Sequence, residues 1–493
     1  MSPRSLVRRT VAAVAGTAVV AGGLMAVAPA PSAHADSVAP NAAANWLVGE
    51  LDATGLLHGD VAKTIDFALA LKEIGGHQAT LAKIASGVDG KLDAYAVDGV
   101  SYAQASLFYR AVGVDPATKA GNLVTKLEGA VDDTSGEMVY PWGGAWSQAL
   151  AVRALDAANS TETDDATDSL IDDFECPSGG WGYWDGAHTS CTADPDNTAD
   201  MLFALLPQKG KSAKIDDAIA RGISWLKAAQ KADGSFEAYE VNASSTGLAG
   251  QALARAGAAP EAERAALWLR GRQVAGSSCD GKLAAEGGAV GFSDQVVAEG
   301  RTDGIDPAAP GTGYDWYLAT AQSIVALKAA PIGGPLAVTP LFVHVSSTVN
   351  VAATGLAVAE NACLTIGATS TPLRGGATTA TSFVAPVSAQ AYPVTLVAPG
   401  RSFTASLKAL DATKLKIKVA TKIKAKKKAT IKVKGLAAGE PVTVKVGKKT
   451  ATGTANAKGV AKVKVKVKKK GKAKVKVVGA FPDRKGKATT RVR

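Results

Sequence analysis

The sequence is poor in the residues that bind transition metals. Only five histidines and four cysteines occur among its 493 residues. The histidines are His34, His58, His77, His188 and His344. His188 precedes Cys191 by three positions, which suggests a metal site, but a disulfide at Cys191 would remove the thiolate ligand. We therefore predict no metal site, and no sequence feature indicates another cofactor.

Long hydrophobic runs are also scarce, because only one occurs, at residues 11–28. Arg4, Arg8 and Arg9 precede it, and a small-residue Ala-His-Ala site follows it at 33–35. A basic start, a short apolar run and such a site are the three parts of a secretory signal peptide. We therefore predict that residues 1–35 are a cleaved signal and that the protein is exported. An uncleaved membrane anchor is the alternative, and the export route stays open.

Acidic residues are nearly absent from the last part of the chain. Residues 401–493 hold 30 Lys and Arg against 3 Asp and Glu, a net charge of +27. Residues 36–400 hold 22 basic and 41 acidic residues, a net charge of −19. The overall charge of +11 therefore conceals an acidic body and a basic C-terminal part. A basic field of this size attracts polyanions and is weakened by salt.

The four cysteines are Cys176, Cys191, Cys279 and Cys363. An even number in an exported protein favours disulfides over free thiols, and four cysteines allow three pairings. Cys176 and Cys191 flank one short loop rich in Gly and Trp, so we predict that they pair. Cys279 is then left to pair with Cys363. The alternative is that one or both pairs stay reduced.

Amphipathic and apolar helices are predicted to alternate between residues 41 and 328. The apolar helices are expected at 63–74, 101–112, 145–158, 198–206, 245–256 and 315–328. The residues that follow the first five are Gly75, Gly113, Asn159, Pro207 and Gly257. Gly and Asn end helices because they tolerate positive φ, and Pro cannot continue one. This recurrence indicates about six helix pairs.

The two helices of each pair differ in their apolar pattern. The second is apolar on nearly all sides, as in residues 246–254, whereas the first carries one apolar stripe, as at Ile219, Ile223 and Leu226. A helix that is apolar all round is buried on all sides. We therefore predict an inner ring of helices inside an outer ring, which is an α/α toroid, over residues 36–330.

Three motifs resemble the repeat of squalene cyclases and prenyltransferases, in the terpenoid cyclase superfamily. Residues 230–236, Gln-Lys-Ala-Asp-Gly-Ser-Phe, are similar to its Gln-x-x-Asp-Gly-Ser-Trp signature, and Ser178-Gly-Gly-Trp181 resembles its Gly-Gly-Trp core. The Trp-Leu pairs at Trp46, Trp225 and Trp268 resemble the same repeat. The resemblance covers roughly residues 41–328 and implies an α/α toroid with a central cavity.

One further segment resembles a catalytic motif of the cyclases. Residues 194–199, Asp-Pro-Asp-Asn-Thr-Ala, are similar to the Asp-x-Asp-Asp-Thr-Ala motif that opens an inner helix in those enzymes. The resemblance implies that Asp196 is the catalytic proton donor and Asp194 its neighbour, while Asn197 replaces a carboxylate. Protonating carbon requires a tuned, buried carboxylate cluster. Helix capping is the alternative, and the interpretation we favour.

Aromatic residues gather in the loops that lead into the apolar helices. They are Trp142, Trp146, Trp181, Tyr183, Trp184, Tyr314, Trp316 and Tyr317. The toroid fold would place these loops at one mouth of the barrel, where aromatic side chains suit flat or apolar ligands. We predict ligand binding by these eight residues, and the alternative is that they pack the repeat loops.

Two copies of one β module are predicted after the toroid. Residues 354–367 align without gaps on residues 434–447, an offset of 80. The surrounding sequence is rich in Val and Thr with turn residues, which is typical of short antiparallel strands. The turn that ends at Glu360 and Glu440 resembles that of bacterial immunoglobulin-like modules. We predict small antiparallel β-sandwiches at 336–411 and 412–493.

The second copy alternates Lys with Val, which predicts sheets with one apolar and one cationic face. We predict polyanion binding by Lys426, Lys427, Lys428, Lys464, Lys466, Lys468 and Lys474. Outside a bacterial cell the expected partners are anionic wall polymers or lipid surfaces. Specific nucleic-acid binding is not expected, because aromatic residues and arginines are scarce among the lysines. The alternative is that the lysine face is only solvated and keeps the edges of the sheets from pairing with other chains.

Three functions are compatible with these features. We favour an exported, monomeric binding protein, held at the cell envelope by its basic part, whose toroid captures an apolar or flat ligand or a partner. The first alternative is a class II terpene cyclase-like enzyme that uses Asp196 as general acid. The second is a corrinoid carrier, by analogy with proteins that join a toroid to a β domain. Export favours a binding protein, because it separates the toroid from cytosolic isoprenoid diphosphates.

Overall fold

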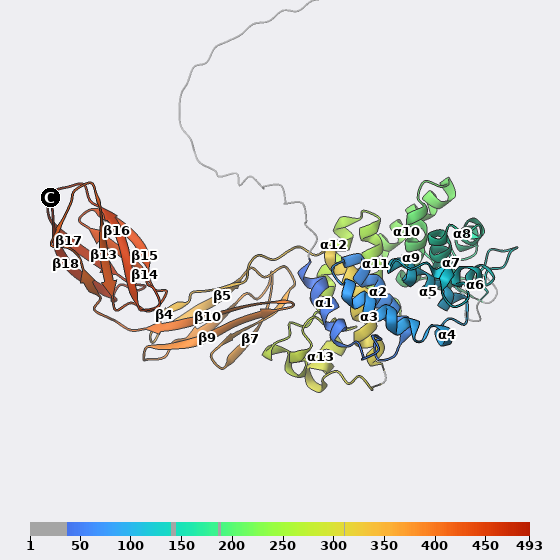
Figure 1. Ribbon diagram of the computed structural model, residues 1–493, viewed down its shortest axis with the longest axis horizontal. Helices are drawn as coiled ribbons and strands as arrows, with labels where there is room; N and C mark the ends of the chain where they lie inside the picture. Colours follow the sequence, from blue (N-terminus) through green and yellow to red (C-terminus); the bar gives the residue numbers. More distant parts are fainter. Residues whose placement is uncertain (1–36, 140–143, 186–188, 310) are drawn as a thin grey trace, which may run out of the picture. The chain divides into compact units, whose positions relative to one another are not determined.

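The computed structural model describes residues 37–139, 144–185, 189–309 and 311–493. The predicted signal peptide, Trp142 and His188 lie outside the described residues. Apart from one small hairpin, the helices come first in the chain and the strands follow from residue 337 (Figure 1). The predicted order of an α domain followed by β domains is therefore confirmed.

Six helices form a closed inner ring. They are α2 (Val61–Ile74), α5 (Gly99–Ala111), α7 (Ala145–Ala158), α9 (Pro195–Leu205), α11 (Ala243–Arg255) and α14 (Ala319–Ala326). Each contacts the next in this order, and α14 contacts α2, which closes the ring. A π-helical segment, η4 (Gly313–Leu318), precedes α14, and a 3₁₀ turn, η5 (Leu327–Ala329), follows it.

Six further helices pack outside this ring. They are α1 (Val38–Gly49), α3 (Gln78–Asp89), α6 (Leu123–Glu128), α8 (Thr163–Asp172), α10 (Ala213–Ala229) and α12 (Ala259–Arg270). Helix α1 contacts α14, and each of the others contacts an inner helix next to it in sequence. The predicted toroid of about six helix pairs is confirmed.

Short elements complete the loops of the toroid. They are α4 (Leu92–Tyr95), η1 (Pro116–Thr118), η2 (Leu206–Gln208), η3 (Ser278–Ala285), α13 (Asp294–Asp303), and a hairpin of β1 (Gly182–Trp184) and β2 (Cys191–Ala193). The inner helices end as their sequences require. Gly75, Gly113, Asn159 and Gly257 have φ values of 76°, 80°, 54° and 79°. This left-handed backbone stops a helix and is least strained in Gly and Asn.

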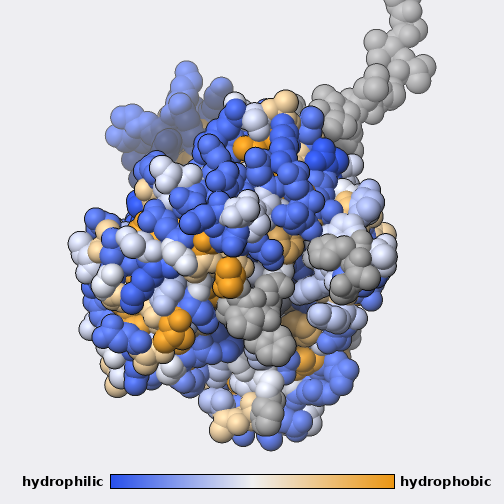
Figure 2. Space-filling view, turned by 90° about the vertical axis from the view of Figure 1, so that its right-hand side faces the viewer, coloured by the Kyte–Doolittle hydropathy of each residue, from blue (hydrophilic) through white to orange (hydrophobic). Residues whose placement is uncertain are grey.

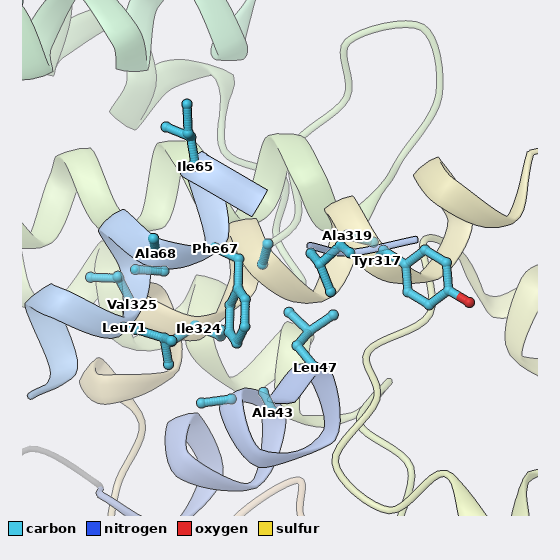
Figure 3. Close-up of a cluster of buried hydrophobic side chains, with 14 of the residues drawn as sticks. Ala43, Leu47, Ile65, Phe67, Ala68, Leu71, Tyr317, Ala319, Ile324 and Val325 are labelled. Carbon is cyan, nitrogen blue, oxygen red and sulfur yellow. The ribbon is translucent and has the colours of Figure 1, made fainter. Parts of the chain in front are cut away.

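Apolar side chains fill the space between the two rings. Figure 3 shows one such cluster, in which Leu47 of α1, Phe67 and Leu71 of α2, and Ile324 of α14 converge. All four side chains are fully buried. Burying a residue of this kind contributes roughly 1.5–3 kcal/mol. This arrangement explains why the outer helices carry one apolar stripe and why the inner helices are apolar on nearly all sides.

The Gly-Gly-Trp motif belongs to the same packing. Trp181 is fully buried, and its indole Nε1 donates a hydrogen bond to the Leu170 carbonyl oxygen over 2.9 Å. A Cβ atom on Gly180 would lie 2.6 Å from the Trp225 ring, and one on Gly182 would lie 1.9 Å from the Thr192 carbonyl oxygen. The glycines are therefore needed because neighbouring groups leave no room for a side chain.

Two β-sandwiches of identical topology follow the toroid (Figure 1). The first contains β3 (Ala337–Thr339), β4 (Phe342–His344), β5 (Thr348–Thr354), β6 (Asn361–Ile366), β7 (Thr369–Arg374), β8 (Ala380–Val384), β9 (Gln390–Ala398) and β10 (Arg401–Leu410). The second contains β11 (Lys416–Lys418), β12 (Lys422–Ile423), β13 (Lys428–Lys434), β14 (Pro441–Val446), β15 (Lys449–Thr454), β16 (Val460–Lys466), β17 (Gly471–Val478) and β18 (Lys485–Val492).

Each sandwich packs a five-stranded sheet on a three-stranded one. The orders are β4-β10-β9-β6-β7 and β3-β5-β8 in the first, and β12-β18-β17-β14-β15 and β11-β13-β16 in the second. The pairing is antiparallel except where β4 and β12 lie parallel to β10 and β18. Valine, leucine and isoleucine from both sheets form each core. The shared topology explains the internal repeat.

Both predicted disulfides are present, Cys176–Cys191 and Cys279–Cys363. The first ties the hairpin of β1 and β2 to the turn before it. The second joins η3 of the toroid to β6 of the first sandwich, where Asn361 Nδ2 also donates to the carbonyl oxygens of Gly271 and Gln273 over 2.8 and 3.0 Å. Disulfides persist in oxidising, extracytoplasmic compartments.

Candidate functional site

Polar side chains cap the N-terminal ends of four inner helices. Asp60, Asp98 and Asn242 accept hydrogen bonds from backbone amides of the first turns of α2, α5 and α11 over 2.7–3.0 Å. Asp194 does the same for α9, where the amides of Asp196 and Asn197 each donate over 2.9 Å. Asp194 is therefore a helix cap, and its carboxylate is already committed to backbone donors.

Asp196 lies in the first turn of α9, and its carboxyl group has a different environment from that of Asp194. Its carboxyl oxygen Oδ1 is buried and has no hydrogen-bond partner among the described residues. Burial raises the pKa of Asp196 to about 6, the Ser245 hydroxyl acts in the opposite direction, and the charge of Asp194 adds to the rise. A carboxylic acid in this setting keeps its proton to a higher pH than an exposed one does.

The predicted aromatic cluster divides into buried and exposed members. Trp181, Trp316 and Tyr317 are buried, and the Tyr317 ring stacks on the rings of Trp46 and His58. Trp184 is half-buried. The exposed members are Trp146, Tyr183 and Tyr314, at 39%, 56% and 62%. Ligand binding stays a prediction for all eight, and these three offer the most free aromatic surface.

A cavity of about 260 Å³ lies within the inner ring. Its lining comes from five inner helices, α2, α7, α9, α11 and α14. The lining residues lie in the middle and C-terminal parts of these helices, away from the capped ends. The charged ones are Asp66, Lys72, Glu73, Arg153, Asp200 and Arg255. The lumen is thus polar at its walls, which is unlike a dry apolar pocket.

Asp66, Arg153 and Asp200 form the inner part of this lining. Arg153 Nη1 lies 4.0 Å from Asp200 Oδ1, a charge pair longer than a hydrogen bond. Burial raises the pKa of Asp200 to about 7, and the positive charge of Arg153 opposes this rise. Burial likewise raises the pKa of Asp66 to about 6, again against the influence of Arg153.

The outer part of the cavity is already paired. Arg255 forms an ion pair with Glu73, and Gln251 Nε2 donates to the same Glu73 carboxylate over 3.0 Å. The Arg255 guanidinium lies over the Phe203 ring, 4.6 Å from its centre, and that of Arg153 lies 5.6 Å from it. The same phenyl ring therefore attracts both guanidinium groups.

Asp66, Arg153 and Asp200 are not among the site residues predicted from the sequence. A signal was present, because each is a charged residue inside a helix that is otherwise apolar on most sides. Asp196 and Asp200 are also four residues apart, which places them on one face of α9. A charge on a buried helix indicates a polar space or a partner next to it. The partners, however, come from helices far apart in the chain.

The lysines of the second sandwich face solvent. All seven predicted polyanion-binding lysines are exposed. Lys428, Lys464 and Lys466 lie on the three-stranded sheet, where Lys428 is the cross-strand partner of Lys466. Lys426 and Lys427 lie in the turn before β13. Lys468 and Lys474 lie elsewhere, against a groove beside β17.

This lysine groove has a volume of about 640 Å³ and twelve lining residues. Nine of them are lysines, namely Lys445, Lys448, Lys449, Lys468, Lys469, Lys470, Lys472, Lys474 and Lys476. The others are Gly447, Val467 and Ala473, so no acidic side chain lines the groove. Within the described part of the chain, none of the nine forms an ion pair with a carboxylate. Seven of these lysines were not among the predicted set.

In the described ranges, no group of three or more His, Cys, Asp or Glu side chains is placed to hold a metal ion. No helix in the same ranges has the length and apolarity needed to cross a membrane. The face shown in Figure 2 is mainly hydrophilic, and its hydrophobic residues form small separate patches.

Comparisons with known proteins find similarity only in structure. No protein-family model matches the chain, and no curated protein sequence matches it. Among solved structures, a protein from Actinoplanes is 17% identical with a TM-score of 0.43, covering 60% of this chain and 99% of that one. The type II terpene cyclase MstE from Scytonema is 14% identical with a TM-score of 0.43, covering 59% and 96%.

An unsaturated glucuronyl hydrolase specific for heparin is 12% identical with a TM-score of 0.41, covering 59% of this chain and 96% of its own. Values this low do not transfer an activity or a substrate to this chain. The α/α toroid is instead evident from its own twelve helices.

Proposed function

We propose that the protein is an exported binding protein whose second sandwich attaches it to phosphate-bearing surfaces of the cell envelope. The lysine groove carries this proposal, because nine lysines line one concave surface without any acidic side chain. Phosphate groups occur both in anionic wall polymers and in lipid head groups. The ammonium groups of flexible lysines bind such groups as point charges, without a fixed geometry.

The arrangement of the lysines supports polyanion binding over mere solvation. Lys445 is the cross-strand partner of Lys476, which is in turn the partner of Lys487. Like charges opposite each other destabilise a sheet, so three lysines in one row carry an energetic cost. Alternating Lys with Glu would keep the strands soluble without that cost. A polyanion that lies along the groove would remove the repulsion.

The experiment compares two charge-matched variants of the chain from residue 36 onward. The groove variant is Lys468→Gln/Lys469→Gln/Lys470→Gln. The control is Lys416→Gln/Lys418→Gln/Lys434→Gln, on β11 and β13, which removes the same charge from exposed lysines of another surface. Binding is measured to cell walls with and without their anionic polymers, and to phosphatidylglycerol and phosphatidylcholine vesicles, over a range of salt concentrations.

We expect the groove variant to bind more weakly than the control, and the binding of the unmodified chain to fall as salt is added. The wall arm and the vesicle arm then identify the source of the phosphate. Equal weakening of both variants would reject the groove as the site. No binding of the unmodified chain to either surface would reject the proposed function.

For the toroid, we retain capture of an apolar or flat ligand as part of the same proposal. It is supported by the exposed aromatic side chains of Trp146, Tyr183 and Tyr314. Substitution of all three by Ala should abolish the binding of an apolar fluorescent probe. The control is Tyr392→Ala in the first sandwich. Unchanged probe binding would reject this part.

A second candidate function is proton transfer by Asp196. It is favoured by the buried, unpartnered carboxyl oxygen and by the raised pKa of this residue. The charged walls of the lumen count against it, because carbocation chemistry needs an apolar cavity. Turnover of a polyprenyl epoxide that disappears in Asp196→Asn would support it. The corrinoid alternative stays a prediction, which the visible absorbance of the purified protein tests.

A further inference from the structure

Three charged groups in the toroid lumen lack hydrogen bonds. Among the described residues, the carboxylates of Asp66 and Asp200 accept none and the guanidinium of Arg153 donates none, although all three line the 260 Å³ cavity. Asp200 is 8% exposed. The side chains of Arg153 and Asp200 are 21% and 11% exposed, so their polar atoms open onto the cavity. The convergence of these three charged groups on one cavity indicates a ligand that pairs with them there.

The spacing of the charges restricts the chemistry of this ligand. Arg153 Nη1 and Asp200 Oδ1 are 4.0 Å apart, so the two opposite charges are neighbours on the cavity wall. A ligand that pairs with both must carry a cationic and an anionic group on adjacent atoms. An α-amino acid meets this requirement, because one carbon bears both its ammonium and its carboxylate group.

Ligands with a single charge fit less well. An anion that pairs with Arg153 would meet the negative charges of Asp66 and Asp200. An amine that pairs with those carboxylates would leave the guanidinium of Arg153 without an acceptor. Glu73 and Arg255 do not change this balance, because they pair with each other at the outer part of the cavity. Lys72, the remaining charged residue of the lining, is exposed to solvent.

The rest of the lining suits an aliphatic or aromatic side chain. Leu69, Leu150, Phe203, Leu248 and Val325 contribute apolar surface to the same cavity. They come from five different helices of the inner ring. A ligand anchored at Arg153 and Asp200 would place its side chain against these residues.

We propose that the toroid lumen binds a free α-amino acid with an apolar side chain, its ammonium group at Asp66 and Asp200 and its carboxylate at Arg153. This site is separate from the lysine groove and from the exposed aromatic residues, so it does not depend on the proposed envelope binding. The toroid would then take two ligands, a zwitterionic amino acid in its lumen and an apolar or flat ligand at the exposed aromatic residues.

Titration calorimetry on the chain from residue 36 onward tests the proposal with three matched probes. L-leucine carries both charges, 3-methylbutylamine lacks the carboxylate, and 4-methylpentanoate lacks the ammonium group. L-leucine should bind about tenfold more tightly than either analogue, a difference of about 1.4 kcal/mol. Equal binding of an analogue would overturn the proposal. So would the absence of binding by L-leucine, L-isoleucine, L-valine, L-methionine and L-phenylalanine.

Variants test the named residues. Asp200→Asn keeps the shape of the side chain and removes its charge, so L-leucine should bind about tenfold more weakly or worse. Asp168→Asn removes a carboxylate from the outer helix α8 that pairs with Lys214, and binding should not change. Equal affinities in the two variants would overturn the assignment. Should Asp200→Asn not fold, Asp66→Asn takes its place, and the three probes test the unmodified chain.

Discussion

Arg484 and Glu440 form a two-point ion pair inside the second sandwich. Arg484 Nε donates to Oε1 of Glu440 over 2.7 Å, and Nη2 donates to Oε2 over 2.8 Å. The two side chains are 4% and 0% exposed. The backbone amides of Ala437 and Ala480 donate to the same carboxylate. This explains why the repeated turn ends in Glu, because the carboxylate holds the turn, a neighbouring loop and an arginine together.

We expect Glu440→Gln to destabilise the second sandwich by about 3–5 kcal/mol, since it removes the buried counter-charge of Arg484 and leaves only the exposed Asp411 at 3.7 Å. Hydrogen exchange of peptides from β14 and β18 in increasing urea measures this locally. The matched control is Glu360→Gln in the first sandwich. Its partner Arg401 is 17% exposed, so the loss there should be smaller. An equal or greater loss at Glu360 would contradict this explanation.

The two disulfides should differ in their contribution to stability. Cys279–Cys363 closes a loop of 84 residues and Cys176–Cys191 one of 15. Restricting the unfolded chain contributes roughly 4.5 kcal/mol for the longer loop and about 3 kcal/mol for the shorter one. Chemical denaturation of the two Cys→Ser double variants checks this order. The reverse order would show that strain or residual structure outweighs loop entropy.

Ionisation of Asp200 should make the toroid less stable as the pH rises. Its pKa is raised to about 7 in the folded chain from an ordinary value of 3.8. The folded state therefore binds more protons than the unfolded state between these values, so stability is full below about pH 4 and is lost up to about pH 7. Asp66, Asp196 and Arg153 face the same group. The pKa values of Asp66 and Asp196 are raised as well, so ionisation of these two groups also lowers the stability as the pH rises.

Asp200→Asn should flatten this dependence. We expect the drop in unfolding free energy of the toroid between pH 5 and pH 8 to shrink by ~1 kcal/mol or more, since one pKa unit corresponds to about 1.4 kcal/mol. Urea denaturation at several pH values, followed by tryptophan fluorescence, measures it. An unchanged slope would mean that Asp200 is solvated and titrates normally.

Trp181 and Tyr183 should respond in opposite ways to substitution. Trp181 is fully buried and donates to Leu170, whereas Tyr183 is 56% exposed. Trp181→Ala should therefore cost about 3–5 kcal/mol of toroid stability, and Tyr183→Ala no more than about 0.5 kcal/mol. Denaturant unfolding checks both. A stable Trp181→Ala protein with altered ligand binding would instead support a binding role for this residue.

Much of the architecture could be predicted from the sequence. Helix periodicity, the Gly and Asn residues at helix ends, the Lys/Val alternation and the offset of 80 between the β modules are each encoded within a few neighbouring residues. The pairing of Cys176 with Cys191 followed from one short loop, and the second disulfide from what remained. These features could be predicted because they depend on the backbone and burial preferences of neighbouring residues and not on distant partners.

The candidate sites depended on the tertiary structure. The sequence grouped Trp181, Trp316 and Tyr317 with Trp146, Tyr183 and Tyr314, because all six lie in similar loops. Only packing decides that the first three are buried and the last three exposed. Asp66, Arg153 and Asp200 are separated by long stretches of chain, and closure of the inner ring brings them to one cavity.

The sequence by itself thus determined the toroid, the sandwiches, both disulfides and the separation of charge, because each is set by local pattern. The tertiary structure decided which lysines share a groove and which carboxylates share the lumen. Those relationships depend on strand register and on the order of helices around the ring. They are properties of distances between remote residues, which no local pattern specifies.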